Sequence, residues 1–126
     1  MMRNLLQNKY FLLLSAILWT SIIFWGCSMP GKNLPSVHPF PHFDKIIHFT
    51  FFFVFYIRWY LFCPRTKFYS MLLILLSVLY GFGIEYYQMY FVIGRSFDVW
   101  DGVFDTLGAV LAFLVVSRKS KVVSIE

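Results

Sequence analysis

This sequence of 126 residues contains few charged residues. Lys, Arg, Asp and Glu make up 13% of it, whereas a soluble domain usually carries about 25%. This shortage excludes a water-soluble globular protein of ordinary composition. Hydrophobic residues supply 60% of the chain, and the mean hydropathy is +0.69. We therefore expect the lipid bilayer to be its solvent and its principal partner.

Cysteine is scarce too, with two residues, Cys27 and Cys63. Two cysteines give little information about the redox compartment of the protein. The two thiols fall at opposite ends of the predicted bundle, so we expect no disulfide between them. Gly26-Cys27 resembles a lipoprotein cleavage point after a signal peptide. Phe24 and Trp25 stand where small or aliphatic residues are usual, so we expect the first helix to remain uncleaved.

Four apolar runs are long enough, or nearly so, to cross a hydrocarbon core of about 30 Å as helices. Helices are required because lipid cannot satisfy unpaired backbone groups. The predicted spans are residues 10–26, 46–62, 70–91 and 100–117, with a proline-rich loop before the second. The sequence predicts an all-α integral membrane four-helix bundle that forms a single domain, residues 1–126.

The basic residues flank the apolar runs rather than forming a patch, so the net charge of +5 does not indicate a nucleic-acid partner. Cytoplasmic loops are rich in Lys and Arg, and most of these residues fall at the end that carries both termini. They are Arg3, Lys9, Arg58, Arg65, Lys67, Arg118, Lys119 and Lys121. We predict that both termini are cytoplasmic. Trp59 and Tyr60 at the inner boundary and Trp100 at the outer one are expected to be interface anchors.

The acidic residues gather at the opposite, outer end. Five of the six lie there: Asp44, Glu85, Asp98, Asp101 and Asp105. By the rise of a helix, Asp105 is roughly 9 Å and His48 about 7 Å below the outer boundary. A charge at the bilayer centre costs about 3 kcal/mol or more on insertion scales. These shallower groups cost less, but they still need partners, water or altered protonation.

Helical spacing places the polar residues on shared faces. Asp44 and His48 are four residues apart and share one side of the second helix. Small and polar residues form two stripes, on the third and fourth helices. The stripes are Ser77, Gly81, Glu85 and Gln88, and Asp101, Asp105, Gly108 and Ala112. Because small residues let membrane helices approach closely, we predict that Gly81 and Gly108 pack these two helices together.

The order of the polar residues resembles that of the VanZ-like membrane proteins. The matching pieces are Ser28-x-Pro30-Gly31, Asp44-Lys45-x-x-His48-Phe49, Glu85-x-x-Gln88, Gly94-Arg95-x-x-Asp98-x-x-Asp101 and Gly108. The resemblance implies an integral membrane protein of the bacterial cytoplasmic membrane and envelope. The founding member is associated with low-level teicoplanin resistance. The chain departs from the family pattern in two places: Ile93 replaces a usual proline, and Asp105 replaces a common asparagine, which adds negative charge.

The candidate ligand-binding cluster combines these residues. It comprises Asp44, Lys45, His48, Glu85, Gln88, Arg95, Asp98, Asp101 and Asp105. His48 is a ligand, a proton carrier, an ion-pair partner of Asp44 or Asp101, or a structural imidazole. Arg95 either binds a phosphate or carboxylate with its planar fork or pairs with Asp98 or Glu85. An oxygen-rich set with one imidazole suits a divalent ion, but no local metal-binding motif is present, so we assign no metal and no cofactor.

Three functions remain open. The first is a non-enzymatic envelope protein whose outer pocket binds a lipid head group, a cell-wall precursor or a glycopeptide antibiotic. The second is a membrane-embedded enzyme that uses the carboxylates as acid, base or metal ligands on a lipid-linked substrate. No serine or cysteine nucleophile stands beside a base. The third is a small transporter, which the lack of an internal repeat disfavours.

Overall fold

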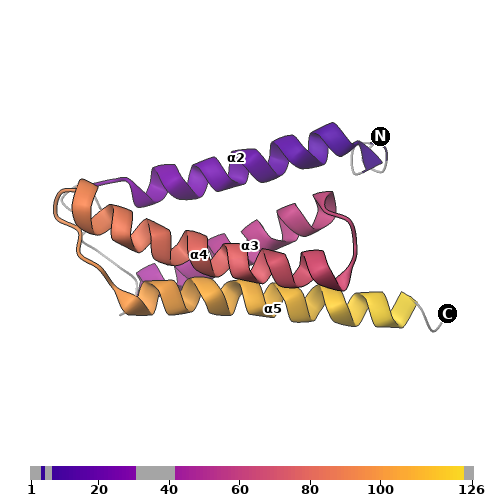
Figure 1. The fold of residues 1–126 in the computed structure, drawn as a ribbon. Helices are drawn as coiled ribbons and strands as arrows, with labels where there is room; N and C mark the ends of the chain where they lie inside the picture. Colours follow the sequence, from indigo (N-terminus) through magenta and orange to yellow (C-terminus); the bar gives the residue numbers. More distant parts are fainter. Residues whose placement is uncertain (1–3, 5–6, 31–41, 124–126) are drawn as a thin grey trace.

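Four long antiparallel helices make up the part of the chain that the structure describes in detail (Figure 1). The computed structural model describes residues 4, 7–30 and 42–123, and the proline-rich segment 31–41 and His38 within it lie outside these residues. The helices are α2 (Lys9–Cys27), α3 (Phe43–Phe62), α4 (Lys67–Phe91) and α5 (Val99–Val123). All four are long and apolar enough to cross a membrane. The prediction of an all-α, four-helix membrane protein is confirmed.

The helix boundaries extend beyond the predicted spans. The α3 helix begins at Phe43 and so includes Asp44 in its first turn. A carboxylate is stabilised there by the positive end of the helix dipole. The α4 helix begins three residues earlier than predicted because the Thr66 hydroxyl accepts a hydrogen bond from the Tyr69 N–H at 3.3 Å. The α5 helix continues through the basic segment to Val123, and cations stabilise a helix C-terminus.

The α3 helix packs against the other three, whereas α2 contacts mainly α3 (Figure 1). The prediction that Gly108 faces α4 is wrong. A Cβ atom at Gly108 would collide with the carbonyl oxygen of Phe49 in α3. Gly102 of α5 instead faces the Phe82 ring of α4. Six residues rotate a helix by roughly 240°, so Gly108 points to the other neighbour. Gly81 does lie against α5, as predicted.

Hydrogen bonds from aromatic side chains attach α2 to the bundle. The indole N–H of Trp19 donates to the Phe51 carbonyl at 2.9 Å, and that of Trp59 donates to the Thr20 hydroxyl at 3.0 Å. The Tyr80 hydroxyl donates to the Thr20 carbonyl at 2.8 Å. Trp59 therefore joins α3 to α2, a contact that the sequence did not predict.

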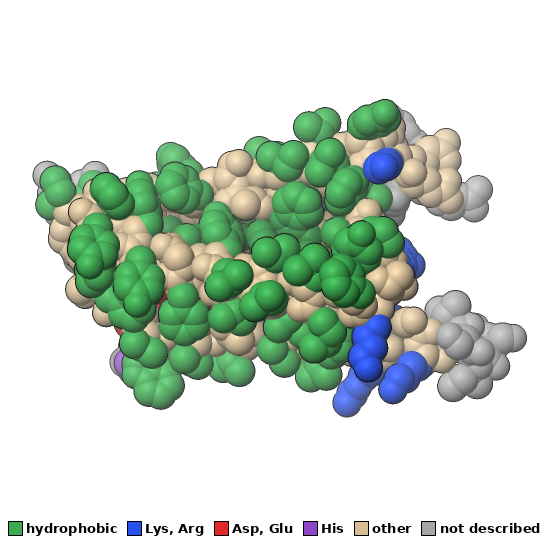
Figure 2. Space-filling view, in the orientation of Figure 1, with side chains coloured by type: hydrophobic (Ala, Val, Ile, Leu, Met, Phe, Trp, Pro, Cys, Tyr) green, Lys and Arg blue, Asp and Glu red, His purple; other side chains and the backbone are tan. Residues whose placement is uncertain are grey.

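The outer surface is apolar along most of its length (Figure 2). Leu14 and Leu79, for example, are 65% and 59% exposed. A large exposed apolar surface is unfavourable in water and suits contact with lipid chains. Arg65 lies in the α3–α4 turn, Lys67 begins α4 and Arg118 lies near the end of α5, and Lys and Arg side chains gather at one end of the molecule (Figure 2). Both termini of the helical bundle lie at this end (Figure 1), and the acidic residues of the described segments lie at the other.

Candidate functional site

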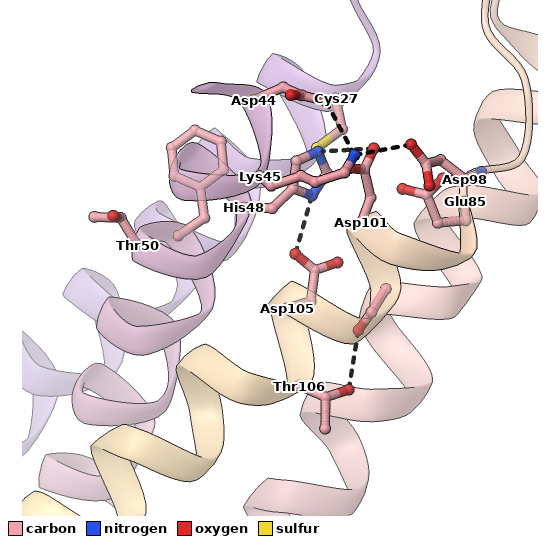
Figure 3. Close-up of polar contacts among 12 residues, drawn as sticks. Cys27, Asp44, Lys45, His48, Thr50, Glu85, Asp98, Asp101, Asp105 and Thr106 are labelled. Atoms are coloured by element: carbon pink, nitrogen blue, oxygen red, sulfur yellow. Dashed lines mark hydrogen bonds and ion pairs between the residues drawn. The ribbon is translucent and has the colours of Figure 1, made fainter. Parts of the chain in front are cut away.

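Ionisable side chains from α3, α4, α5 and the α4–α5 turn meet at one end of the bundle (Figure 3). We call this group the acidic cluster. It consists of Asp44, Lys45 and His48 of α3, Glu85 of α4, Asp98 of the turn, and Asp101 and Asp105 of α5. The structure thus brings together seven of the nine residues that the sequence singled out.

The Lys45 ammonium group is the centre of the outer half of the acidic cluster. Its Nζ atom lies 2.9 Å from Asp101 Oδ1, 3.0 Å from Asp98 Oδ2 and 3.4 Å from Asp44 Oδ2. Lys45 is buried, and a buried ammonium group requires such partners. These contacts connect α3 to α5 and to the turn before it.

Lys45 and His48, three residues apart, are the pair that faces α5. The sequence argument grouped Asp44 with His48 instead. The Asp44 side chain is 52% exposed and forms its ion pair with Lys45. Of the two ion-pair partners predicted for His48, Asp101 is found, at 3.6 Å, and Asp44 is not, because Asp44 lies at the solvent-facing edge of the helix end.

The His48 ring lies between two carboxylates of α5. Its Nδ1 atom is 2.9 Å from Asp105 Oδ1, and its Nε2 atom is 3.6 Å from Asp101 Oδ2. The first distance is that of a strong hydrogen bond, whereas the second exceeds the usual range. Asp101 therefore contacts both Lys45 and His48 of α3, the first through one carboxylate oxygen and the second through the other.

Two carboxylates lie in the deeper half of the acidic cluster, and both are completely buried. Glu85 Oε2 accepts a hydrogen bond from the Asp98 N–H at 3.0 Å. Among the described residues, Glu85 Oε1 and Asp105 Oδ2 have no hydrogen-bond partner. Gly81 makes room for Asp105, since a Cβ atom there would lie 2.9 Å from Asp105 Oδ2. Buried oxygens without a hydrogen-bond partner are costly unless they are protonated or satisfied by water or a bound group.

Gln88 and Arg95 lie outside these contacts. The Gln88 amide is buried and donates to the Cys27 carbonyl at 2.9 Å, so it packs α4 against α2. Arg95 is half-buried in the turn, and its guanidinium forms no ion pair with any described residue. The predicted pairing of Arg95 with Asp98 or Glu85 is not found. Asp98 is instead paired with Lys45.

Asp98 connects the turn to the start of α5. Its Oδ1 atom accepts a hydrogen bond from the Trp100 N–H at 2.9 Å, and its Oδ2 atom contacts Lys45. Partial burial alone would raise the pKa of Asp98, but the hydrogen bonds from Lys45 and Trp100 outweigh it and hold the pKa below its usual value. Asp98 is therefore ionised at neutral pH.

Two groups of side chains in the acidic cluster have metal-ligand spacing. His48, Glu85 and Asp101 form one group, and Asp44, Asp98 and Asp101 form the other. The Lys45 ammonium already occupies the second group. The charge of the whole cluster is unbalanced, because five carboxylates face Lys45, His48 and the nearby Arg95.

A comparison with known protein families matches the VanZ/LLP1 model over residues 11–120. The chain belongs to the VanZ/LLP1 family. The resemblance seen in its motifs is thereby confirmed, as is a multi-pass membrane protein of the VanZ kind. No curated protein and no solved structure matches it.

Some features of this VanZ/LLP1 site were not evident from the sequence. The sequence named Lys45 but gave it no central role, although a lysine at the start of an apolar helix is itself a signal for a buried partner. It also did not reveal the role of the Cys27 carbonyl as the acceptor for Gln88. The type of a residue does not reveal whether its backbone carbonyl accepts a side-chain hydrogen bond.

Proposed function

We propose that this VanZ/LLP1 protein is a non-enzymatic protein of the bacterial cytoplasmic membrane whose acidic cluster binds the amine of an amphiphile. A lipid head group, a lipid-linked cell-wall precursor and a glycopeptide antibiotic with an acyl tail share this chemistry. Each joins an ammonium group to an apolar chain. The acidic cluster would contact the amine, and the apolar helices would contact the chain.

The observation that carries the proposal is a pair of partly exposed carboxylates. The side chains of Asp44 and Asp98 are 52% and 39% exposed, and both contact the Lys45 ammonium. They therefore lie close together at the edge of the acidic cluster. Each keeps acceptor capacity toward solvent, and a second ammonium group there would form charge-assisted hydrogen bonds.

An apolar groove beside Asp44 indicates that the ligand is an amphiphile with an apolar chain rather than a free amine. The groove has a volume of about 300 Å³ and runs along the first turns of α3. It is lined by Trp19, Phe43, Ile46, Ile47, Thr50 and Phe51. Ile47 is three residues after Asp44, so the two share one side of the helix. An acyl chain in this groove would hold its head group near Asp44.

Binding of amine-bearing amphiphiles to the purified protein in detergent tests the proposal. We would titrate short-chain phosphatidylethanolamine and teicoplanin, each against its N-acetylated form. The amine form of at least one should bind about 10-fold more tightly, a difference of ~1.4 kcal/mol. D44N should remove this preference, and E126Q, a charge-removing change outside the described residues, should keep it. Equal binding of the acetylated and amine forms would refute the proposal.

The acid–base alternative is favoured by the position of His48 between Asp101 and Asp105. The nearby threonine hydroxyls do not supply an activated nucleophile. Thr50 and Thr106 each donate to a carbonyl of their own helix, at 2.8 and 3.0 Å. Mass spectrometry of a lipid-linked precursor incubated with the protein would decide between the two functions, since only an enzyme yields a product that the H48Q variant does not.

We further propose that the acidic cluster faces outward and both termini face the cytoplasm. The basic residues at the opposite end support this orientation. Ser96 in the α4–α5 turn and Ser120 near the end of α5 are both exposed and provide a matched pair. In a C27S/C63S background, a membrane-impermeant maleimide should label S96C in intact cells and S120C only after permeabilisation. The reverse pattern would contradict the orientation.

A further inference from the structure

Three buried ligand-type side chains of the acidic cluster come from three different helices. His48 comes from α3, Glu85 from α4 and Asp101 from α5, and all are buried. One donor atom of each lies within 4.8 Å of the others. We propose that these three side chains bind one divalent cation. This site does not depend on the proposed function, which uses the exposed carboxylates Asp44 and Asp98.

The Glu85 carboxylate has one oxygen that is free to bind a cation. Glu85 is completely buried, and Oε2 is bound by the Asp98 N–H. Oε1 has no hydrogen-bond partner among the described residues. A cation would satisfy this oxygen and remove the cost of burying it unpaired.

The His48 ring is oriented as in a metal site. A metal-binding histidine usually donates its second ring N–H to a carboxylate, and Nδ1 lies 2.9 Å from Asp105 Oδ1 (Figure 3). With that proton on Nδ1, the lone pair of Nε2 faces Asp101 Oδ2 at 3.6 Å. Two ligands of one tetrahedral ion, each about 2.1 Å from it, are separated by about 3.4 Å. The observed separation is close to this value.

The charge balance agrees with a doubly charged ion. The acidic cluster contains five carboxylates: Asp44, Glu85, Asp98, Asp101 and Asp105. Lys45 and Arg95 compensate two of these charges, and His48 must be neutral to donate its Nε2 lone pair, so three negative charges remain. A divalent cation would compensate two of them.

The donor set indicates which ions fit. Two carboxylates and one imidazole suit hard or borderline ions such as Mn²⁺ and Zn²⁺. Soft ions that require thiolates are disfavoured. Because Lys45 occupies the alternative group of Asp44, Asp98 and Asp101, we expect the ion to bind to His48, Glu85 and Asp101 instead.

Metal titration of the chelator-treated protein in detergent tests the site. Calorimetry with Mn²⁺ and Zn²⁺ should give about one equivalent for at least one ion. E85Q keeps the shape of the side chain and should weaken binding about 10-fold or more. E126Q, the same substitution outside the described residues, should bind as the wild type does.

Pulsed electron paramagnetic resonance of Mn²⁺ on the wild-type protein keeps the test independent of mutant folding. It should show coupling to one imidazole nitrogen, unchanged in H42Q because His42 is exposed and lies outside the cluster. Absence of stoichiometric binding, or binding without imidazole coupling, would overturn the proposal. So would loss of binding in D44N with full retention in E85Q, which would assign the ion to the other group. Because D44N and E85Q separate amphiphile binding from metal binding, either proposal can fail alone.

Discussion

Replacing Gly108 by alanine should force α3 and α5 apart and destabilise the folded protein by about 3 kcal/mol, near the upper end of typical overpacking costs. The added Cβ atom would collide with the Phe49 carbonyl oxygen and approach the Phe53 nitrogen to 3.1 Å. Both are backbone atoms, so no side chain can rotate away. Thermal unfolding in detergent, followed by circular dichroism, measures the effect.

Gly83 of α4 provides the matched control. A Cβ atom there would meet nothing within 4 Å. G83A should leave the protein equally stable or stabilise it by up to about 1 kcal/mol, because alanine is the better helix former. If G108A unfolds at the same temperature as G83A, the close contact between α3 and α5 is not a determinant of stability.

Replacing Lys45 by methionine should also be severe, and we expect a loss of about 3 kcal/mol. Removing one partner of a buried ion pair leaves uncompensated charge and commonly costs about 3–5 kcal/mol. The lower value applies because Asp44 and Asp98 retain access to solvent, whereas Asp101 is buried. The unfolding temperature of K45M in detergent measures this loss.

Two further variants test whether charge is the cause. K67M removes an exposed lysine at the opposite end of the bundle and should have little effect. The double variant K45M/D101N removes the buried, unpaired carboxylate and should recover part of the lost stability. If it is no more stable than K45M alone, the lysine acts through packing of its aliphatic stem rather than through its charge.

Most of the fold could be predicted from the sequence because the bilayer imposes one strong requirement. A segment crossing lipid must be long, apolar and helical, so hydropathy located all four helices, with the largest error at the end of α5, which continues to Val123 rather than ending at residue 117. Helix ends were less predictable because they depend on local partners. Thr66 caps α4 through a hydrogen bond that composition does not reveal.

The sequence predicted which residues belong to the acidic cluster but not which of them contact one another. Helical periodicity places residues on faces, and it grouped Asp101 with Asp105 correctly on one side of α5. It does not determine which neighbouring helix each face meets. For that reason Gly108 was assigned to the wrong partner, and the partners predicted for His48 were Asp44 and Asp101 but not Asp105, which it contacts most closely.

The division of the acidic cluster between α3 and α5 has a consequence for biogenesis. The α5 helix emerges last from the ribosome and carries Asp101 and Asp105, both buried in the finished bundle. An isolated α5 would enter lipid with two unpaired acids. Lys45 and His48 will already be in the membrane when it arrives. Insertion of α5 into the membrane should therefore depend on prior insertion of α3, which supplies the partners of its carboxylates. The helices would then assemble in the order of the sequence.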